Sequence, residues 1–166
     1  MKTKCMLFLV IVIFLSGCEQ PSNTSSQDLG WNVQVTQAEV KEALETTEIV
    51  TLYTGDKNEV NHENMPNPGN VYVILELVLT KTKSETGSFD WDDLALEDVN
   101  GNKYQRLEND SFLELHNYSP RMTGLPIRFG ESTGWVCYEI TKEEASGTLV
   151  LVYTSSKGKQ IIEIKH

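Results

Sequence analysis

The strongest structural signal in this sequence is the stretch VYVILELVL, residues 71–79. Its odd-numbered positions are all aliphatic, and Glu76 is the one charged residue on the other face. Successive side chains of a strand point to opposite faces of its sheet. A nearly continuous apolar run rich in β-branched residues therefore predicts a central strand that is covered on both sides.

Several shorter segments are also predicted to be strands, the first of them from alternating apolar and polar residues. They are Trp31–Val35, Leu94–Leu96, Lys103–Gln105, Trp135–Ile140, Thr148–Tyr153 and Gln160–Ile164. Asn100-Gly101 is a strong hairpin signal between the second and third of these segments. Residues 37–45 fit either a long first strand or a single helical turn. Seven or so short strands predict an all-β fold, a two-sheet antiparallel β-sandwich of about seven to eight strands over residues 31–166.

Four stretches of this sequence follow an order found in a known domain. They are Gly69–Ile74, Leu96–Tyr104, Gly130-Glu131 and Gly134–Ile140. The chain resembles the telokin-like, immunoglobulin-type domain of many secreted and lipid-anchored bacterial proteins. That domain has no known function and is similar in fold to a small secreted immunoprotective antigen. The family often has Pro before Gly-Glu, where this chain has Phe129. The resemblance implies an immunoglobulin-like antiparallel β-sandwich outside the cytoplasm and supplies no catalytic or binding residues.

The N-terminus carries the pattern of an export signal. Lys2 and Lys4 precede ten apolar residues, 6–15, which as a helix would rise only about 15 Å, half the thickness of a bilayer's hydrocarbon core. The sequence LSGC at residues 15–18, at the end of this apolar run, resembles the lipobox of bacterial lipoproteins, in which the Cys sulfur receives a diacylglycerol. Two acyl chains on Cys18 would anchor the chain stably. The alternative is ordinary cleavage that releases a soluble secreted protein.

These signals divide the chain into a signal peptide at 1–17, a lipidated Cys with a flexible tether at 18–30, and the sandwich. The 166 residues include 14 Lys and Arg against 24 Asp and Glu, and removing residues 1–17 leaves 12 against 24, a net charge of −12. This charge argues against binding nucleic acid, and it leaves the lipid to hold the protein to the membrane. We expect a lipid-anchored protein on the extracytoplasmic face of the cell membrane.

The string GESTG, residues 130–134, matches the G-x-S-x-G pattern of serine hydrolases and makes Ser132 a candidate nucleophile. That pattern carries catalysis on a strand–turn–helix elbow, whereas a strand is expected to follow here. After Ser132 there is no Asp, and the last His is the final residue, His166. The preferred interpretation is a tight turn between strands, with no enzyme activity and no cofactor.

The densest acidic cluster comprises Asp90, Asp92 and Asp93, with Glu97 and Asp98 nearby. Carboxylates in loops are the usual ligands of Ca²⁺, so this cluster is a weak candidate metal site. An extracytoplasmic sensor that binds Ca²⁺ or a cationic peptide is therefore an alternative function. The spacing lacks the positions of an EF-hand, and surface carboxylates around a hairpin explain the cluster without a metal.

The remaining chemically active residues have structural interpretations. The histidines have no metal-ligand spacing; they are His62, His116 and His166. Cys137 lies in a strand with no basic neighbour, which predicts a buried and inert thiol. Cys5 would leave with the signal and Cys18 would be acylated, so no disulfide is expected. The tryptophans are expected at strand positions in the core or on a sheet face: Trp31, Trp91 and Trp135.

A recognition surface is most strongly indicated at Leu107–Thr123, which must bridge two strands. Its weak candidate binding residues are Phe112, His116, Tyr118 and Arg121. The alternative, which we favour, is one more strand with Phe112, Leu113 and Leu115 packing inward. The polar loop Asp56–Asn70 is a second exposed candidate. The preferred function is a lipid-anchored binding or accessory module, with a protein or peptide partner outside the cytoplasm.

Overall fold

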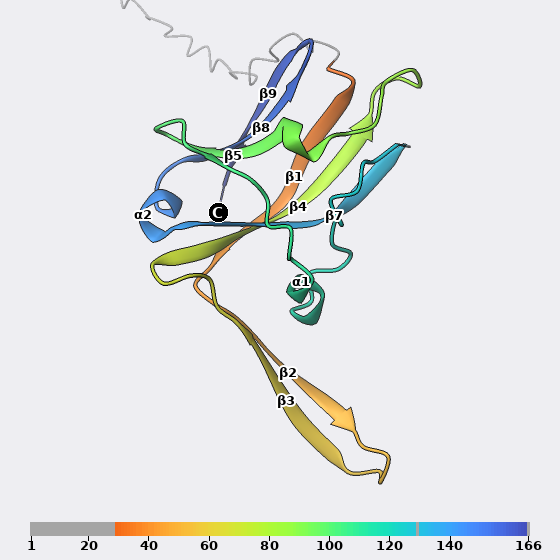
Figure 1. Cartoon of the computed structure of the whole chain (residues 1–166), viewed down its shortest axis with the longest axis vertical. Helices are drawn as coiled ribbons and strands as arrows, with labels where there is room; N and C mark the ends of the chain where they lie inside the picture. Colours follow the sequence, from red (N-terminus) through yellow and green to blue (C-terminus); the bar gives the residue numbers. More distant parts are fainter. Residues whose placement is uncertain (1–28, 129, 166) are drawn as a thin grey trace, which may run out of the picture.

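The computed structural model describes residues 29–128 and 130–165, and within them nearly all regular structure is β-strand (Figure 1). The nine strands of this part are β1 (Trp31–Lys41), β2 (Leu44–Thr51), β3 (Lys57–Asn64), β4 (Asn70–Lys81), β5 (Leu94–Asp98), β6 (Lys103–Tyr104), β7 (Glu131–Thr141), β8 (Leu149–Ser155) and β9 (Gly158–Ile164). Three short helical turns are η1 (Trp91–Asp93), α1 (Phe112–Leu115) and α2 (Lys142–Ala145). No helix among these residues is long and apolar enough to cross a bilayer.

Seven of the strands form the two sheets of a sandwich. One sheet has the order β1-β4-β7, the other β6-β5-β8-β9, and every pair within them is antiparallel. The odd-numbered residues of β4 from Val71 to Leu79 are buried in the core between the sheets, together with Leu96 of β5 and Leu151 of β8. The predicted all-β antiparallel sandwich is confirmed, and so is the role of residues 71–79 as its central strand.

The opposite face of β4 is also covered, because residues 105–123 cross it. Tyr72 and Ile74 pack there against Leu113 of α1 and Cys137 of β7 in a second apolar cluster. The two ends of this segment are tied to β7, since Leu107 N–H donates to Cys137 O at 2.7 Å and Met122 N–H to Trp135 O at 2.8 Å. The predicted two-sided burial of β4 is therefore confirmed over this stretch.

The remaining two strands, β2 and β3, form a separate hairpin that we call the arm, residues 44–64. Its register is regular from the pair Leu44/Asn64 to the pair Thr51/Lys57. Figure 1 shows the arm projecting from one end of the sandwich, beyond the ends of β1 and β4. The arm accounts for the difference between the nine strands described and the seven to eight predicted.

Several predictions about local structure are decided or corrected by the structure. Of the alternatives for residues 37–45, the long first strand holds: β1 runs to Lys41, with a register shift between Val35 and Gln37. The loop predicted at Asp56–Asn70 is wrong, because residues 57–64 form β3. Val60 is the one apolar residue in β3, so alternation alone could not reveal a strand that exists through its pairing with β2.

The strand favoured at Leu107–Thr123 is also wrong. Residues 112–115 form the helical turn α1, which buries Leu113 completely but leaves Leu115 about half exposed. The apolar spacing in this segment reflects one buried turn and not a strand face. Trp91 is buried as expected, but it lies in the turn η1, whereas Trp31 and Trp135 lie in strands.

Candidate functional site

The base of the arm is held to the sandwich by His116, which follows α1 and is 7% exposed. Its Nδ1 lies 2.8 Å from the Thr46 hydroxyl and its Nε2 lies 2.9 Å from Asn64 Oδ1. The Asn64 oxygen can only accept, so Nε2 carries the hydrogen and Nδ1 accepts from Thr46. Burial, with a smaller effect of nearby His62, lowers the pKa of His116 and favours this neutral form. Two predicted recognition segments, 107–123 and 56–70, therefore meet at one histidine.

Two further predicted binding residues, Phe112 and Tyr118, pack onto the sheet and do not face outward. Phe112 stacks on Tyr72 with ring centroids 5.3 Å apart, and Tyr118 contacts Trp135 edge-on at 4.9 Å. The Tyr118 hydroxyl donates to Glu39 Oε2 at 3.0 Å. Burial, followed by this hydrogen bond, raises the pKa of Tyr118. The two aromatic rings predicted as part of a recognition surface instead pack the 105–123 segment against the sheet.

The fourth predicted residue, Arg121, belongs to a buried ion network that the sequence did not reveal. Asp110 is completely buried; its Oδ1 accepts from Arg121 at 2.8 Å and its Oδ2 from Arg106 at 3.1 Å. Arg106 also donates to Met122 O at 3.0 Å, and Glu114 lies 3.6 Å from Arg121 Nε. Arg106 lies four residues before Asp110, but Arg121 lies eleven residues after it and is brought close only by the fold, so the sequence did not reveal the network.

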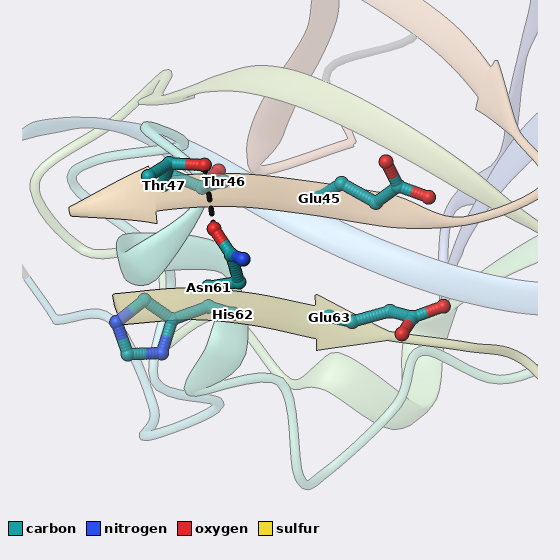
Figure 2. Close-up of a pocket in the computed structure, with 6 residues that line it drawn as sticks. All are labelled: Glu45, Thr46, Thr47, Asn61, His62 and Glu63. Atoms are coloured by element: carbon teal, nitrogen blue, oxygen red, sulfur yellow. Dashed lines mark hydrogen bonds between the residues drawn. The ribbon is translucent and has the colours of Figure 1, made fainter. Parts of the chain in front are cut away.

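A polar hollow of about 350 Å³ lies along the arm, and Figure 2 shows the residues that line it. They are Glu45, Thr46, Thr47, Asn61, His62 and Glu63. The Thr47 hydroxyl donates to Asn61 Oδ1 at 2.8 Å, and His62 lies 3.3 Å from Glu48. Glu45 and Glu63 are directly paired across the strands, and their carboxylates extend in the same direction (Figure 2). The arm thus presents a concentrated negative charge.

The outer part of the arm exposes apolar side chains. Ile49 is 62% exposed, Leu52 is 42% exposed and Tyr53 is fully exposed, while Val60 opposite Glu48 is also accessible. An isolated two-stranded hairpin is marginally stable in water, so an arm with uncovered apolar residues is suited to a partner. Sequence reasoning missed this element, although Thr54-Gly55-Asp56 between two β-rich segments is a recognisable turn signal.

Ser132 does not lie on a nucleophile elbow. It is in β7, opposite Leu79 of β4, and the strand continues to Thr141. The tight turn preferred for residues 130–134 is therefore also wrong, since Glu131 already begins the strand. The last glycine of the motif has a packing role: a Cβ at Gly134 would lie 2.8 Å from Pro120 O, where the 105–123 segment crosses the sheet. The motif is explained without catalysis.

Two of the acidic residues at 90–98, Asp90 and Asp98, stabilise local turns. Asp90 accepts from Asp92 N–H at 3.1 Å and caps η1, while burial, with the charges of Asp90 and Asp92, raises the pKa of Asp93. Asp98 accepts from both the backbone and the side chains of Asn100 and Asn102. Burial opposes ionisation of Asp98, but these bonds outweigh it and lower its pKa. Within residues 29–128 and 130–165, no three His, Cys, Asp or Glu side chains gather to hold a metal.

The remaining candidates from the sequence are Cys137 and several residues at the N-terminus, at position 129 and at the C-terminus. Cys137 is a free thiol that is completely buried, as predicted, and burial raises its pKa. Cys18, the signal peptide, tether residues 18–28, Phe129 and His166 lie outside the described residues.

Comparison with known proteins identifies a shared architecture and no function. No family model matches the chain, and no curated protein matches it. A conserved hypothetical protein from Bacillus anthracis is 17% identical, with a TM-score of 0.50 over 82% of this chain and 88% of that one. The yjhA protein from Bacillus subtilis is 15% identical, with a TM-score of 0.49 over 82% and 92%. An uncharacterized β-sandwich protein from Clostridium difficile 630 is 13% identical, with a TM-score of 0.43 over 82% and 86%.

Proposed function

We propose that this chain is a lipid-anchored, non-catalytic binding or accessory module on the extracytoplasmic face of the cell membrane. The observation that carries the binding role is the arm, which projects from the sandwich and exposes Ile49, Leu52 and Tyr53 to solvent. The lipobox resemblance at residues 15–18 carries the anchoring role. The resemblance to domains of secreted and lipid-anchored proteins supports the same location.

The course of the chain supports a consistent orientation for such a module. β1 starts at Trp31, at the end of the sandwich far from the arm, and runs toward the arm (Figure 1). Its 11 residues would span about 35 Å and the eight paired residues of each arm strand about 25 Å more. With Cys18 anchored, twelve tether residues reach at most about 40 Å. The tether would therefore join the sandwich at the end opposite to the arm.

The anchoring role is tested with Cys18→Ser in the full chain. We expect wild type in the membrane pellet and the variant released from it, because the variant lacks the sulfur that would carry the diacylglycerol. Mass spectrometry of the wild-type N-terminal peptide should show acylated Cys18. An unmodified thiol in a membrane-bound wild type would contradict the anchor and leave the binding role to its own test.

The binding role is tested by placing a photo-crosslinking amino acid at Tyr53 in cells. Leu125 is the matched control, because it is 71% exposed and apolar but lies on the sandwich. We expect a discrete crosslinked product from position 53 that is absent from position 125. Equal crosslinking at the two positions, or none at position 53, would contradict a partner on the arm.

A further inference from the structure

We propose that the outer edge of β2 is a strand-addition site that takes an extended basic segment of a partner protein. This inference deepens the binding role proposed above and rests on it. It names which part of the arm is occupied, how the partner is held, and which charge the partner carries.

The hydrogen bonding of the arm defines which backbone groups are available at that edge. At the turn, Leu52 N–H donates inward to Asp56 O at 2.7 Å, which makes this a hydrogen-bonded pair. Antiparallel ladders alternate between bonded and non-bonded pairs, so the N–H groups of Glu45, Thr47, Ile49 and Thr51 point outward. Within the described chain, β2 pairs with β3 alone, so this edge faces no other strand.

The β2 edge also lacks the features that usually prevent strand pairing. It is eight residues long, contains neither Lys, Pro nor Gly, and shows no register shift against β3. Five of its residues are β-branched: Thr46, Thr47, Ile49, Val50 and Thr51. Natural edges are commonly protected by Lys, Pro, bulges or shortness. Here the protection against indiscriminate pairing is electrostatic, since Glu45 and Glu48 are the charges on this strand.

The charges of the arm select a basic occupant. The arm carries five carboxylates, Glu45, Glu48, Asp56, Glu59 and Glu63, against a single Lys57. Glu45 and Glu63 face each other across the strands, which is unfavourable for like charges, and neither forms an ion pair with any residue described. A neighbouring strand with Lys or Arg beside Glu45 and Glu48 would relieve this repulsion.

Two other occupants fit the edge less well. A second copy would bring another arm with the same excess of carboxylates alongside the first. An anionic membrane surface would be repelled by the same charges. Glu45 and Glu48 are three residues apart and therefore point to opposite faces, so the matching segment has basic residues at a spacing of three and β-branched residues between them.

The test uses the full chain in detergent micelles and two fluorescent peptides. One is Val-Lys-Thr-Val-Lys-Thr-Val-Lys, and the other has Glu in place of each Lys. We expect the basic peptide to bind saturably, with affinity that falls as salt increases, and the acidic peptide not to bind. Glu45→Gln/Glu48→Gln should weaken binding of the basic peptide by about ten-fold or more.

Thr47 and Asn61 provide a matched pair of edge variants, because they lie directly opposite each other on the two outer edges of the arm. Thr47→Pro and Asn61→Pro each remove the bond between these side chains and one outward N–H, but on opposite edges. We expect Thr47→Pro to weaken binding by about ten-fold or more and Asn61→Pro by less than about two-fold. Circular dichroism checks that both variants keep the wild-type fold.

Several outcomes would overturn this proposal. They are absence of binding by the basic peptide, equal binding of both peptides, and equal loss in the two Pro variants. Sedimentation that shows a wild-type dimer, converted to a monomer by Thr47→Pro, would assign the edge to a second copy instead. If crosslinking from position 53 succeeds in cells while the peptide fails, the binding role survives and the strand-addition site is wrong.

Discussion

The arm and the central strand of the sandwich are both regular antiparallel β-structure, yet their environments are opposite. In β4 every odd-numbered side chain from Val71 to Leu79 is at most 3% exposed, and Ile74 on the other face is completely buried. In β2 only Leu44, its first residue, is buried. Hydrogen-bonded pairing therefore produces a strand in both places, but burial of apolar surface stabilises only one of them. The arm depends on its base, where Leu44 and His116 join it to the sandwich.

The largest change in stability is expected from comparing a core residue of β4 with an exposed residue of the arm, because their burial differs most. Leu77→Ala removes a completely buried side chain from the core and should lower the free energy of unfolding by about 4 kcal/mol. The matched change Ile49→Ala on the arm should alter it by no more than about 0.5 kcal/mol, since Ile49 is 62% exposed. Urea denaturation followed by circular dichroism measures both. Similar losses in the two variants would show that the arm is packed in solution.

A smaller loss is expected at the segment that covers the second face of β4. Asp110→Asn removes the completely buried carboxylate that pairs with Arg106 and Arg121. Among the described residues, this change leaves Arg106 without an ion pair and Arg121 with Glu114 alone, and it should cost about 3 kcal/mol in the free energy of unfolding. The exposed residue Glu108 lies two positions away in the same segment, and Glu108→Gln should cost almost nothing. Urea denaturation of the two variants measures both changes in the free energy of unfolding. If Asp110→Asn left the free energy of unfolding unchanged, the network would not be what holds this segment in place.

The smallest predicted effect is a pH dependence of local stability at the junction between the arm and the sandwich. Burial lowers the folded-state pKa of His116 below its ordinary value of 6.5, so the unfolded chain binds the proton more readily. The contribution of His116 to stability is therefore present above pH 6.5 and is lost as the pH falls through the lower folded-state value. We expect amide hydrogen exchange in β2 and β3, corrected for intrinsic rates, to increase on acidification before exchange in β4 does. His116→Asn should remove this pH dependence, and a dependence that persisted in the variant would assign it elsewhere.

The residues that could and could not be predicted differ in the range of their interactions. Residues 71–79 were predicted correctly because alternation within nine residues reports the burial of both faces. The hairpin at Asn100-Gly101 was predicted for a similar reason, since its turn is local. By contrast, β3 was taken for a loop because its partner β2 defines it, and Leu115 was taken for a buried residue because one helical turn was read as a strand.

The candidate site shows the same limit. Phe112, His116, Tyr118 and Arg121 were selected as a group for their side-chain chemistry, yet each has a different structural partner. His116 contacts Thr46, 70 residues earlier, and Tyr118 contacts Glu39, 79 residues earlier. Arg106 lies four residues before Asp110, but nothing in the sequence indicates that Arg121 is the second arginine at its carboxylate.

By itself, the sequence determined that the protein is built from strands, which of them is central, and where the Asn-Gly turn lies. These features follow from local periodicity and local backbone preference. The tertiary structure alone decided that residues 105–123 cover the sheet, that His116 joins the base of the arm to the sandwich, and that the rest of the arm projects beyond it. Alternation along a strand specifies which side chains avoid water, but the element that covers them is selected by packing between distant parts of the chain.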